Sequence, residues 1–193
     1  MNVATQLKTS VVDYLQGELI SDIKHEFVNG DVFAMSGAKR AHNIISMNLA
    51  GIFHAHLRGA PCRAFGADMK VRLQTATHDC FFYPDLHVTC TTSDIDPYFN
   101  SQPRLIIEVL SESTERYDRS DKFHYYRKLE SLEEYVLIAQ DTQRVECYRR
   151  NNQWDFELYQ TNDKVVFESL GLSLDITDIY EGLVYDVQDQ IQV

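Results

Sequence analysis

The sequence lacks the features that mark membrane, secreted and repeat proteins. Its 193 residues contain no apolar run of about 18 residues, and residues 1–10 have no hydrophobic signal core. Glycine occurs eight times and proline four times, no stretch rich in either divides the chain, and no internal repeat is present. We therefore expect one cytoplasmic domain over residues 1–193 and no membrane partner.

Cysteine pairs and the common catalytic motifs are also missing. The four cysteines form no C-x-x-C pair, so we expect buried, reduced thiols and no structural zinc site. No H-E-x-x-H, Walker, G-x-S-x-G or G-x-G-x-x-G motif occurs. These absences argue against a zinc protease, a nucleotide triphosphatase, a serine hydrolase and a dinucleotide enzyme, and we expect no nucleotide cofactor.

Positive charge is scarce: 18 Lys and Arg stand against 29 Asp and Glu, for a net charge of −11. A nucleic-acid binder needs clustered cations, so this total argues against one. The acidity is uneven, however. Residues 39–128 hold 12 basic against 10 acidic side chains, whereas residues 151–193 hold one Lys against nine acids. A DNA partner is therefore not excluded, and we expect its binding to be weak and salt-sensitive.

Hydrophobic periodicity predicts a mixed α/β fold. Helical spacing predicts helices after Ser10, at 39–57 and at 118–129, with a short helical turn near 178–182. An Asn-Gly pair between apolar runs predicts a hairpin over 25–35. Alternating or apolar runs predict strands at 63–73, 81–90, 105–110 and 134–139, and an antiparallel meander from strands at 144–149, 154–159 and 164–168. Together these elements predict a mixed sheet flanked by helices.

The first candidate for chemistry is Glu108, which interrupts an otherwise apolar strand. A carboxylate buried there costs several kcal/mol unless a cation or hydrogen-bond donors compensate its charge. Asp85 follows Pro84 at the opening of another predicted strand. If the two strands are neighbours, the carboxylates converge, and such oxygen ligands suit Mg²⁺ or Mn²⁺. A site of this kind hydrolyses phosphodiesters.

Lys122 is the second candidate, because helical spacing places it on the apolar face of its helix. One explanation is an ion pair with Asp118, one turn earlier, worth about 0.3 to 0.5 kcal/mol. The other is that its ammonium group reaches the carboxylates of Asp85 and Glu108 and positions water or stabilises phosphate charge.

Glu26 and His42 are weaker candidates. Glu26 shares a hairpin strand face with Val28, so it points either inward or, as most hairpin glutamates do, to solvent. His42 opens the apolar stripe of the helix at 39–57 and is either a core histidine or a group that faces the site.

Taken in order, five segments resemble the Uma2 family (DUF820), of the restriction endonuclease-like PD-(D/E)xK superfamily. The resemblance runs from about Val12 to Gly182. The segments are His25-Glu26-Phe27-Val28-Asn29-Gly30-Asp31, Tyr83-Pro84-Asp85, Ile107-Glu108-Val109-Leu110-Ser111 with Ser113-Thr114, Asp118 through Lys122 to Tyr126, and Ser131-Leu132-x-Glu134-Tyr135. Each segment alone is weakly specific, whereas the ordered set is strongly specific.

The resemblance implies a fold and a site. It implies an α-β-β-β-α-β core over about residues 25–140, with an N-terminal hairpin, and a C-terminal meander over about 144–185. It also implies that Asp85 and Glu108 bind the metal. The superfamily lysine normally stands two residues after the glutamate, where this chain has Leu110, and the family pattern implies that Lys122 replaces it. Glu26 would be a further acidic residue and His42 a helix residue that faces the site.

The resemblance therefore implies a Mg²⁺- or Mn²⁺-dependent endonuclease that hydrolyses DNA. Because Leu110 stands at the usual lysine position, the alternative is a catalytically inactive module that binds DNA or protein. Many superfamily members dimerise to cut both strands, so we expect a homodimer. A purely structural or regulatory homodimer is a third possibility.

Overall fold

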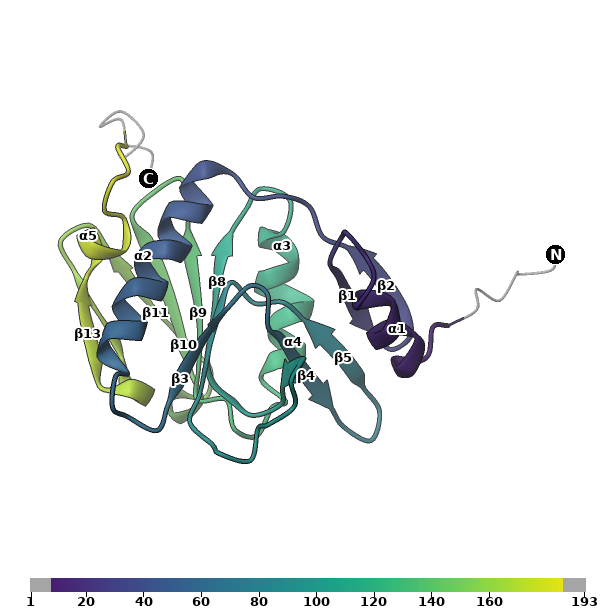
Figure 1. The fold of residues 1–193 in the computed structure, drawn as a ribbon. Helices are drawn as coiled ribbons and strands as arrows, with labels where there is room; N and C mark the ends of the chain where they lie inside the picture. Colours follow the sequence, from purple (N-terminus) through teal and green to yellow (C-terminus); the bar gives the residue numbers. More distant parts are fainter. Residues whose placement is uncertain (1–7, 186–193) are drawn as a thin grey trace.

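A six-stranded mixed sheet forms the centre of the structure, a computed structural model that describes residues 8–185 (Figure 1). Its strand order is β11-β10-β9-β8-β6-β3. The strands are β3 (Arg63–Gly66), β6 (Leu86–Thr89), β8 (Pro103–Leu110), β9 (Glu134–Ala139), β10 (Arg144–Arg149) and β11 (Phe156–Gln160). Within this sheet β8 and β9 pair in parallel and the other described pairs are antiparallel, because the helical segment that connects β8 and β9 crosses one face of the sheet.

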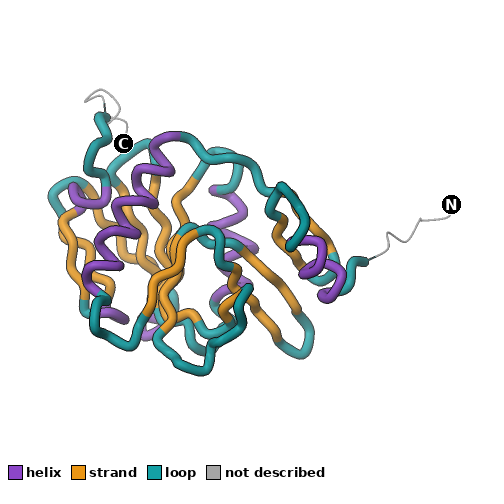
Figure 2. Tube along the Cα trace, viewed as in Figure 1, coloured by secondary structure: helices purple, strands orange, loops and turns teal. Residues whose placement is uncertain are grey.

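The two faces of β8 are buried by different elements. Leu105, Ile107 and Val109 pack in the core cluster with α2 (Arg40–His56), the predicted helix at 39–57. Ile106 and Leu110 point the other way. Figure 2 shows helices on both sides of this sheet, as the prediction of a mixed sheet flanked by helices requires.

The second side of the sheet packs against a helical segment with three parts: α3 (Glu115–Tyr117), the π-helical turn η1 (Asp118–Lys122) and α4 (Phe123–Tyr126). The predicted helix at 118–129 is therefore present but begins and ends about three residues earlier. Tyr126 lies in one cluster with residues of β8, β9 and a second sheet. One face of the helical segment is thus buried between the two sheets, whereas its other face is exposed.

That second sheet has five strands in the order β2-β1-β5-β4-β7. They are β1 (His25–Val28), β2 (Asp31–Ala34), β4 (Lys70–Gln74), β5 (Asp79–Phe82) and β7 (Phe99–Asn100). The predicted hairpin is confirmed: Asn29 and Gly30, with φ of 50° and 95°, make the turn between β1 and β2. Helix α1 (Val11–Glu18), which Ser10 caps, places Tyr14 against Phe27 and Phe81 on the outer face.

Two strand predictions were wrong in their length. The predicted strand at 63–73 is two strands, β3 and β4, and that at 81–90 is also two, β5 and β6. In each pair the chain leaves one sheet and enters the other. The second break falls at Pro84, which has no N–H for a central ladder. Side-chain alternation continues through such a crossing, so the pattern alone predicts one long strand.

The C-terminal meander was predicted correctly for two of its three strands. β10 and β11 extend the six-stranded sheet, but β12 (Lys164–Phe167) pairs with β13 (Leu172–Asp175) in a separate hairpin. The hairpin is anchored by a buried ion pair, in which Arg149 Nε lies 2.9 Å from Glu134 Oε1, while Glu134 also accepts the Glu168 and Ser169 amides. Short 3-10 turns, η2 (Arg150–Asn152) and η3 (Glu168–Leu170), precede β11 and β13, and α5 (Ile176–Ile179) follows.

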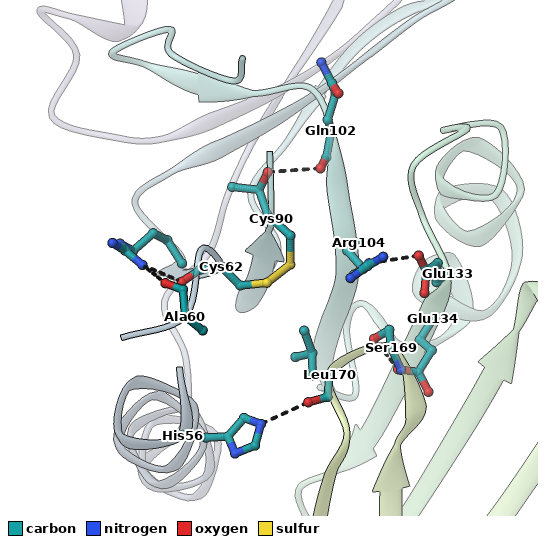
Figure 3. Close-up of a disulfide and its surroundings, with 12 residues drawn as sticks. His56, Ala60, Cys62, Cys90, Gln102, Arg104, Glu133, Glu134, Ser169 and Leu170 are labelled. Atoms are coloured by element: carbon teal, nitrogen blue, oxygen red, sulfur yellow. Dashed lines mark hydrogen bonds and ion pairs between the residues drawn. A yellow bond between two sulfur atoms is a disulfide. The ribbon is translucent and has the colours of Figure 1, made fainter. Parts of the chain in front are cut away.

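The expectation of four reduced cysteines was wrong for two of them. Cys62 and Cys90 form a disulfide (Figure 3). Cys80 and Cys147 are free and buried. Arg63 of β3 lies opposite Thr89 of β6. The cysteines flank this pair at neighbouring strand ends, a proximity that sequence spacing does not show. Over residues 8–185, no helix has the length and apolar character to cross a bilayer.

Candidate active site

The structure brings together all five side chains that the sequence predicted for the site, at the junction of the two sheets. Lys122 lies at their centre. Its Nζ is 2.9 Å from Glu26 Oε1, 3.0 Å from Glu108 Oε1 and 3.6 Å from Asp118 Oδ1. The ammonium group thus contacts both Asp118 and Glu108, whereas its contacts within the described residues do not include Asp85.

Asp85 and Glu108 are adjacent because β6 and β8 pair antiparallel, with Leu86 opposite Ile107. The backbone amide of Asp85 donates to Glu108 Oε2 at 3.4 Å, and the amide of Val109 donates to Asp85 Oδ2 at 2.7 Å. The sequence analysis predicted that these carboxylates converge if their two strands are neighbours. The pairing of β6 with β8 confirms that they are. Each carboxylate is held by the backbone next to the other.

His42 contacts this pair directly, and Glu26 is linked to it through Lys122. His42 comes from the first turn of α2, and its Nε2 lies 3.1 Å from Asp85 Oδ2. Glu26 comes from β1, is only 9% exposed, and accepts the Tyr83 amide at 3.3 Å. Glu26 therefore points inward, unlike most hairpin glutamates, and His42 faces the site.

Burial and mutual repulsion dominate the electrostatics. Burial, together with the charges of Asp118, Asp85 and Glu26, raises the pKa of Glu108 well above its usual value, although Lys122 acts in the opposite sense. Burial would lower the pKa of Lys122, but the surrounding carboxylates raise it well above its ordinary value. Lys122 is thus favoured as a cation, and three acidic side chains, Glu26, Glu108 and Asp118, contact it.

Asp118 and Tyr126 were not predicted to take part in the site. Asp118 is 3% exposed, and its pKa is raised, first by burial. The hydroxyl of Tyr126 donates to Glu108 Oε1 at 3.1 Å. Both flank Lys122 by four residues on one helix face, which is the signal that could have identified them. Leu110, at the usual lysine position, is buried in the apolar cluster below the site.

The carboxylates fit a hard divalent cation better than any other metal. Within the described residues, no group of three or more His, Cys, Asp or Glu side chains is arranged as a metal cage. Mg²⁺ does not need one, because it commonly takes one or two carboxylates and fills its shell with water and phosphate oxygens. Asp85 and Glu108, both carboxylates on adjacent strands, match that requirement.

A hollow of about 540 Å³ lies where β8 and β9 end. Its lining includes Lys39, Leu110 and Arg119, which neighbour His42, Glu108 and Asp118 in sequence. Acidic side chains line it as well, including Glu112 and Glu115. The hollow therefore carries no strong charge of either sign, and the side chains of the site are not part of its lining.

Comparison with known proteins gives consistent results. Residues 11–187 match the Uma2 family, described as "Putative restriction endonuclease". Two proteins of Synechocystis sp. are each 36% identical to this chain: uncharacterized protein slr1290, covering 92% of this chain and 94% of that protein, and uncharacterized protein sll1609, covering 86% and 97%.

A solved structure from Anabaena variabilis, described as a "putative nuclease belonging to DUF820", has the same fold. It aligns with a TM-score of 0.68 at 20% identity, over 83% of this chain and 91% of that one. The resemblance of the sequence motifs, the matched residues and the shared fold lead to one conclusion. The chain belongs to the Uma2 family.

Proposed function

We propose that this protein is a Mg²⁺- or Mn²⁺-dependent endonuclease that hydrolyses DNA phosphodiester bonds. The observation that carries the proposal is the position of Lys122, whose ammonium group lies 3.0 Å from Glu108 although it comes from a helix and not from β8. A cation therefore stands beside the glutamate despite Leu110. This arrangement restores the charge that the superfamily pattern places two residues after the glutamate.

Asp85 and Glu108 would hold the divalent cation. When bound, that cation supplies positive charge at the scissile phosphate and acidifies water. His42 orients Asp85 through their 3.1 Å contact, and the Val109 amide fixes the same carboxylate. Lys122, which stays protonated, orients the attacking water or stabilises charge on the phosphate oxygens. Hydrolysis then adds water across one P–O ester bond and leaves a phosphate end and a hydroxyl end.

Glu26 and Asp118 hold Lys122 in place. Glu26 lies 2.9 Å from the ammonium group and Asp118 lies 3.6 Å from it. Both carboxylates are largely buried, so they restrict the lysine side chain more than exposed partners would. We therefore assign Glu26 a positioning role for Lys122.

The test is cleavage of plasmid DNA with Mg²⁺ or Mn²⁺ by the wild-type protein and three variants. Asp85→Asn and Lys122→Met should each abolish cleavage. Asp121→Asn is the matched control, because Asp121 is an exposed acid one residue from Lys122. Cleavage that survives Asp85→Asn, or its absence with every metal, contradicts the proposal.

Calorimetric titration with Mn²⁺ tests the metal site separately. Glu108→Gln keeps the shape of the side chain and should remove binding, whereas Asp121→Asn should not. If Mn²⁺ binds equally well to both variants, Glu108 is not a ligand.

The second candidate function is an inactive nuclease-fold module that binds DNA or protein. Leu110 favours it, because the side chain two residues after Glu108 cannot serve as a cation and is buried in the core. Mn²⁺ binding or cleavage that depends on Glu108 decides against this alternative.

We also propose a homodimeric, cytoplasmic enzyme, since two sites are needed to cut both strands of a duplex. Light scattering at micromolar concentration tests the assembly, and a monomer contradicts it. Microscopy of the fluorescently tagged protein in cells tests the location.

A further inference from the structure

The segment between β2 and α2 lies along one border of the candidate site. Phe33, which pairs with Glu26 in the β1–β2 ladder, precedes it in β2, and His42, which contacts Asp85, follows it in α2. Figure 1 shows this segment crossing from the five-stranded sheet to the six-stranded sheet, past the end of α3. The substrate of a hydrolase at this site therefore passes beside residues 33–40.

Phe33 lies on the face of the sheet that carries the site. Residues directly opposite in an antiparallel pair direct their side chains to the same face, so Phe33 and Glu26 share one. Glu26 uses that face to reach Lys122 at 2.9 Å. The Cβ atoms of opposite residues lie roughly 5 Å apart, so the side chains of Phe33 and Glu26 leave the backbone side by side.

The ring of Phe33 is exposed although it belongs to the most hydrophobic residue class. Its exposure is 54%, and β2 is an edge strand of its sheet. Phe27, the large aromatic residue on the other face of this hairpin, is 2% exposed and packs against Tyr14 and Phe81. Phe27 thus stabilises the fold by packing in the core, whereas the exposed ring of Phe33 has no such role.

The same segment carries two cations. Lys39 and Arg40 are both exposed at the start of α2. Lys39 has one acidic neighbour, Glu112, at 3.6 Å, and that carboxylate is 90% exposed, so the pair is weak. An aromatic ring followed by exposed cations is the combination that binds single-stranded nucleic acids, with a base on the ring and phosphates on the cations.

We propose that Phe33 stacks on an unpaired base of the substrate, that Lys39 and Arg40 bind its phosphates, and that the protein prefers single-stranded or locally unpaired DNA. This inference rests on the proposed nuclease function and specifies its substrate. A base within an intact duplex presents no free face to the ring, so a duplex lacks this contact.

The test measures binding and needs no catalysis. Fluorescence anisotropy with a short labelled oligonucleotide, in EDTA, compares the single strand with its duplex. Phe33→Ala should weaken binding to the single strand by about tenfold and leave duplex binding unchanged. Phe33→Trp should retain the affinity, because indole stacks at least as well.

Val32 provides the matched control. It neighbours Phe33 on the same edge strand, is 41% exposed, and lies opposite Phe27, on the face away from the site. Val32→Ala should not change the affinity. A combined Lys39→Ala and Arg40→Ala variant should lower the slope of log affinity against log salt for the single strand by about 1.4.

The inference is overturned if Phe33→Ala and the wild type bind the single strand with equal affinity. It is also overturned if Phe33→Ala and Val32→Ala lose equal affinity, or if the wild type does not prefer the single strand to the duplex. A change in oligomeric state on Phe33→Ala would instead assign the ring to a protein interface and also contradict the proposal. If the protein cleaves plasmid DNA but any of these results is obtained, the nuclease function is supported and the role of Phe33 is refuted. If binding depends on Phe33 but no cleavage occurs, the nuclease function is refuted and the role of Phe33 in binding is supported.

Discussion

His87 makes the fold sensitive to acid independently of the candidate active site. The residue belongs to β6, is fully buried, and accepts a hydrogen bond from the Asn100 amide at 2.9 Å. Its ring stacks on Phe65 with centroids 5.3 Å apart. Burial lowers the pKa of His87 from 6.5 to about 3, and neither contacting side chain carries a charge that would restore it.

The sign and size of the effect follow from linkage. The unfolded chain binds a proton at His87 below pH 6.5, while the folded protein does so only near pH 3. Stability is therefore complete above pH 6.5 and falls as the pH drops toward 3. The loss of stability reaches about 2 kcal/mol at pH 5 and about 5 kcal/mol at its limit, because each unit of pKa difference contributes about 1.4 kcal/mol.

Urea unfolding in EDTA at about pH 7.5 and pH 5 measures this difference, and His87→Gln provides the comparison because it stays neutral. Between the two pH values the wild type should lose about 2 kcal/mol more than His87→Gln. His54→Gln, which removes an exposed imidazole from α2, should behave like the wild type. If the wild type and His87→Gln lose stability in parallel, His87 is already protonated in the fold and the reasoning is refuted.

Three further changes test the charge clusters and the disulfide. Lys122→Met leaves Glu108 and Asp118 buried without their cation and should lower the free energy of unfolding by about 3 to 5 kcal/mol in urea titrations. Adding Glu108→Gln removes one of these charges and should recover at least about 1 kcal/mol of that loss. A double variant that is no more stable than Lys122→Met contradicts this prediction. Replacing Cys62 and Cys90, separated by 28 residues, with Ser should cost about 3 to 4 kcal/mol, and a reducing agent should then have no further effect on the thermal midpoint. Arg149→Met should lower the free energy of unfolding by about 3 to 5 kcal/mol, because Glu134 loses its buried partner. Arg144→Met, at a side chain that is 44% exposed, should lower it by less than about 1 kcal/mol. Similar losses of stability in the two variants would show that burial does not determine the effect.

Much of the core could be predicted from local pattern. The helix at 39–57 and the strands at 105–110 and 134–139 have a single dominant periodicity, so the structure differs from the prediction there by only a few residues. Glu108 was identifiable because a lone carboxylate in an apolar strand needs a partner. Lys122 was identifiable for the same reason, as a cation on an apolar helix face.

Features that depend on register or on a change of sheet could not be predicted. Nothing in the spacing of Cys62 and Cys90 shows that they flank a pair of neighbouring strand ends. The division of 63–73 into β3 and β4 leaves side-chain alternation intact. The location of Phe33 beside Glu26 needs both the hairpin register and the identity of the buried face.

The strands of the two sheets alternate along the chain, and this arrangement limits how the molecule can be divided. β1, β2, β4, β5 and β7 build one sheet, while β3, β6 and β8 of the other lie between or after them in sequence. No single cut of the chain separates the sheets. Glu26 belongs to one sheet and Glu108 to the other, so their shared contact with Lys122 forms only after both sheets have assembled. The contacts of Lys122 with Glu26 and Glu108 therefore form late in folding, and a chain in which only one sheet has assembled leaves the ammonium group without one of these two carboxylates.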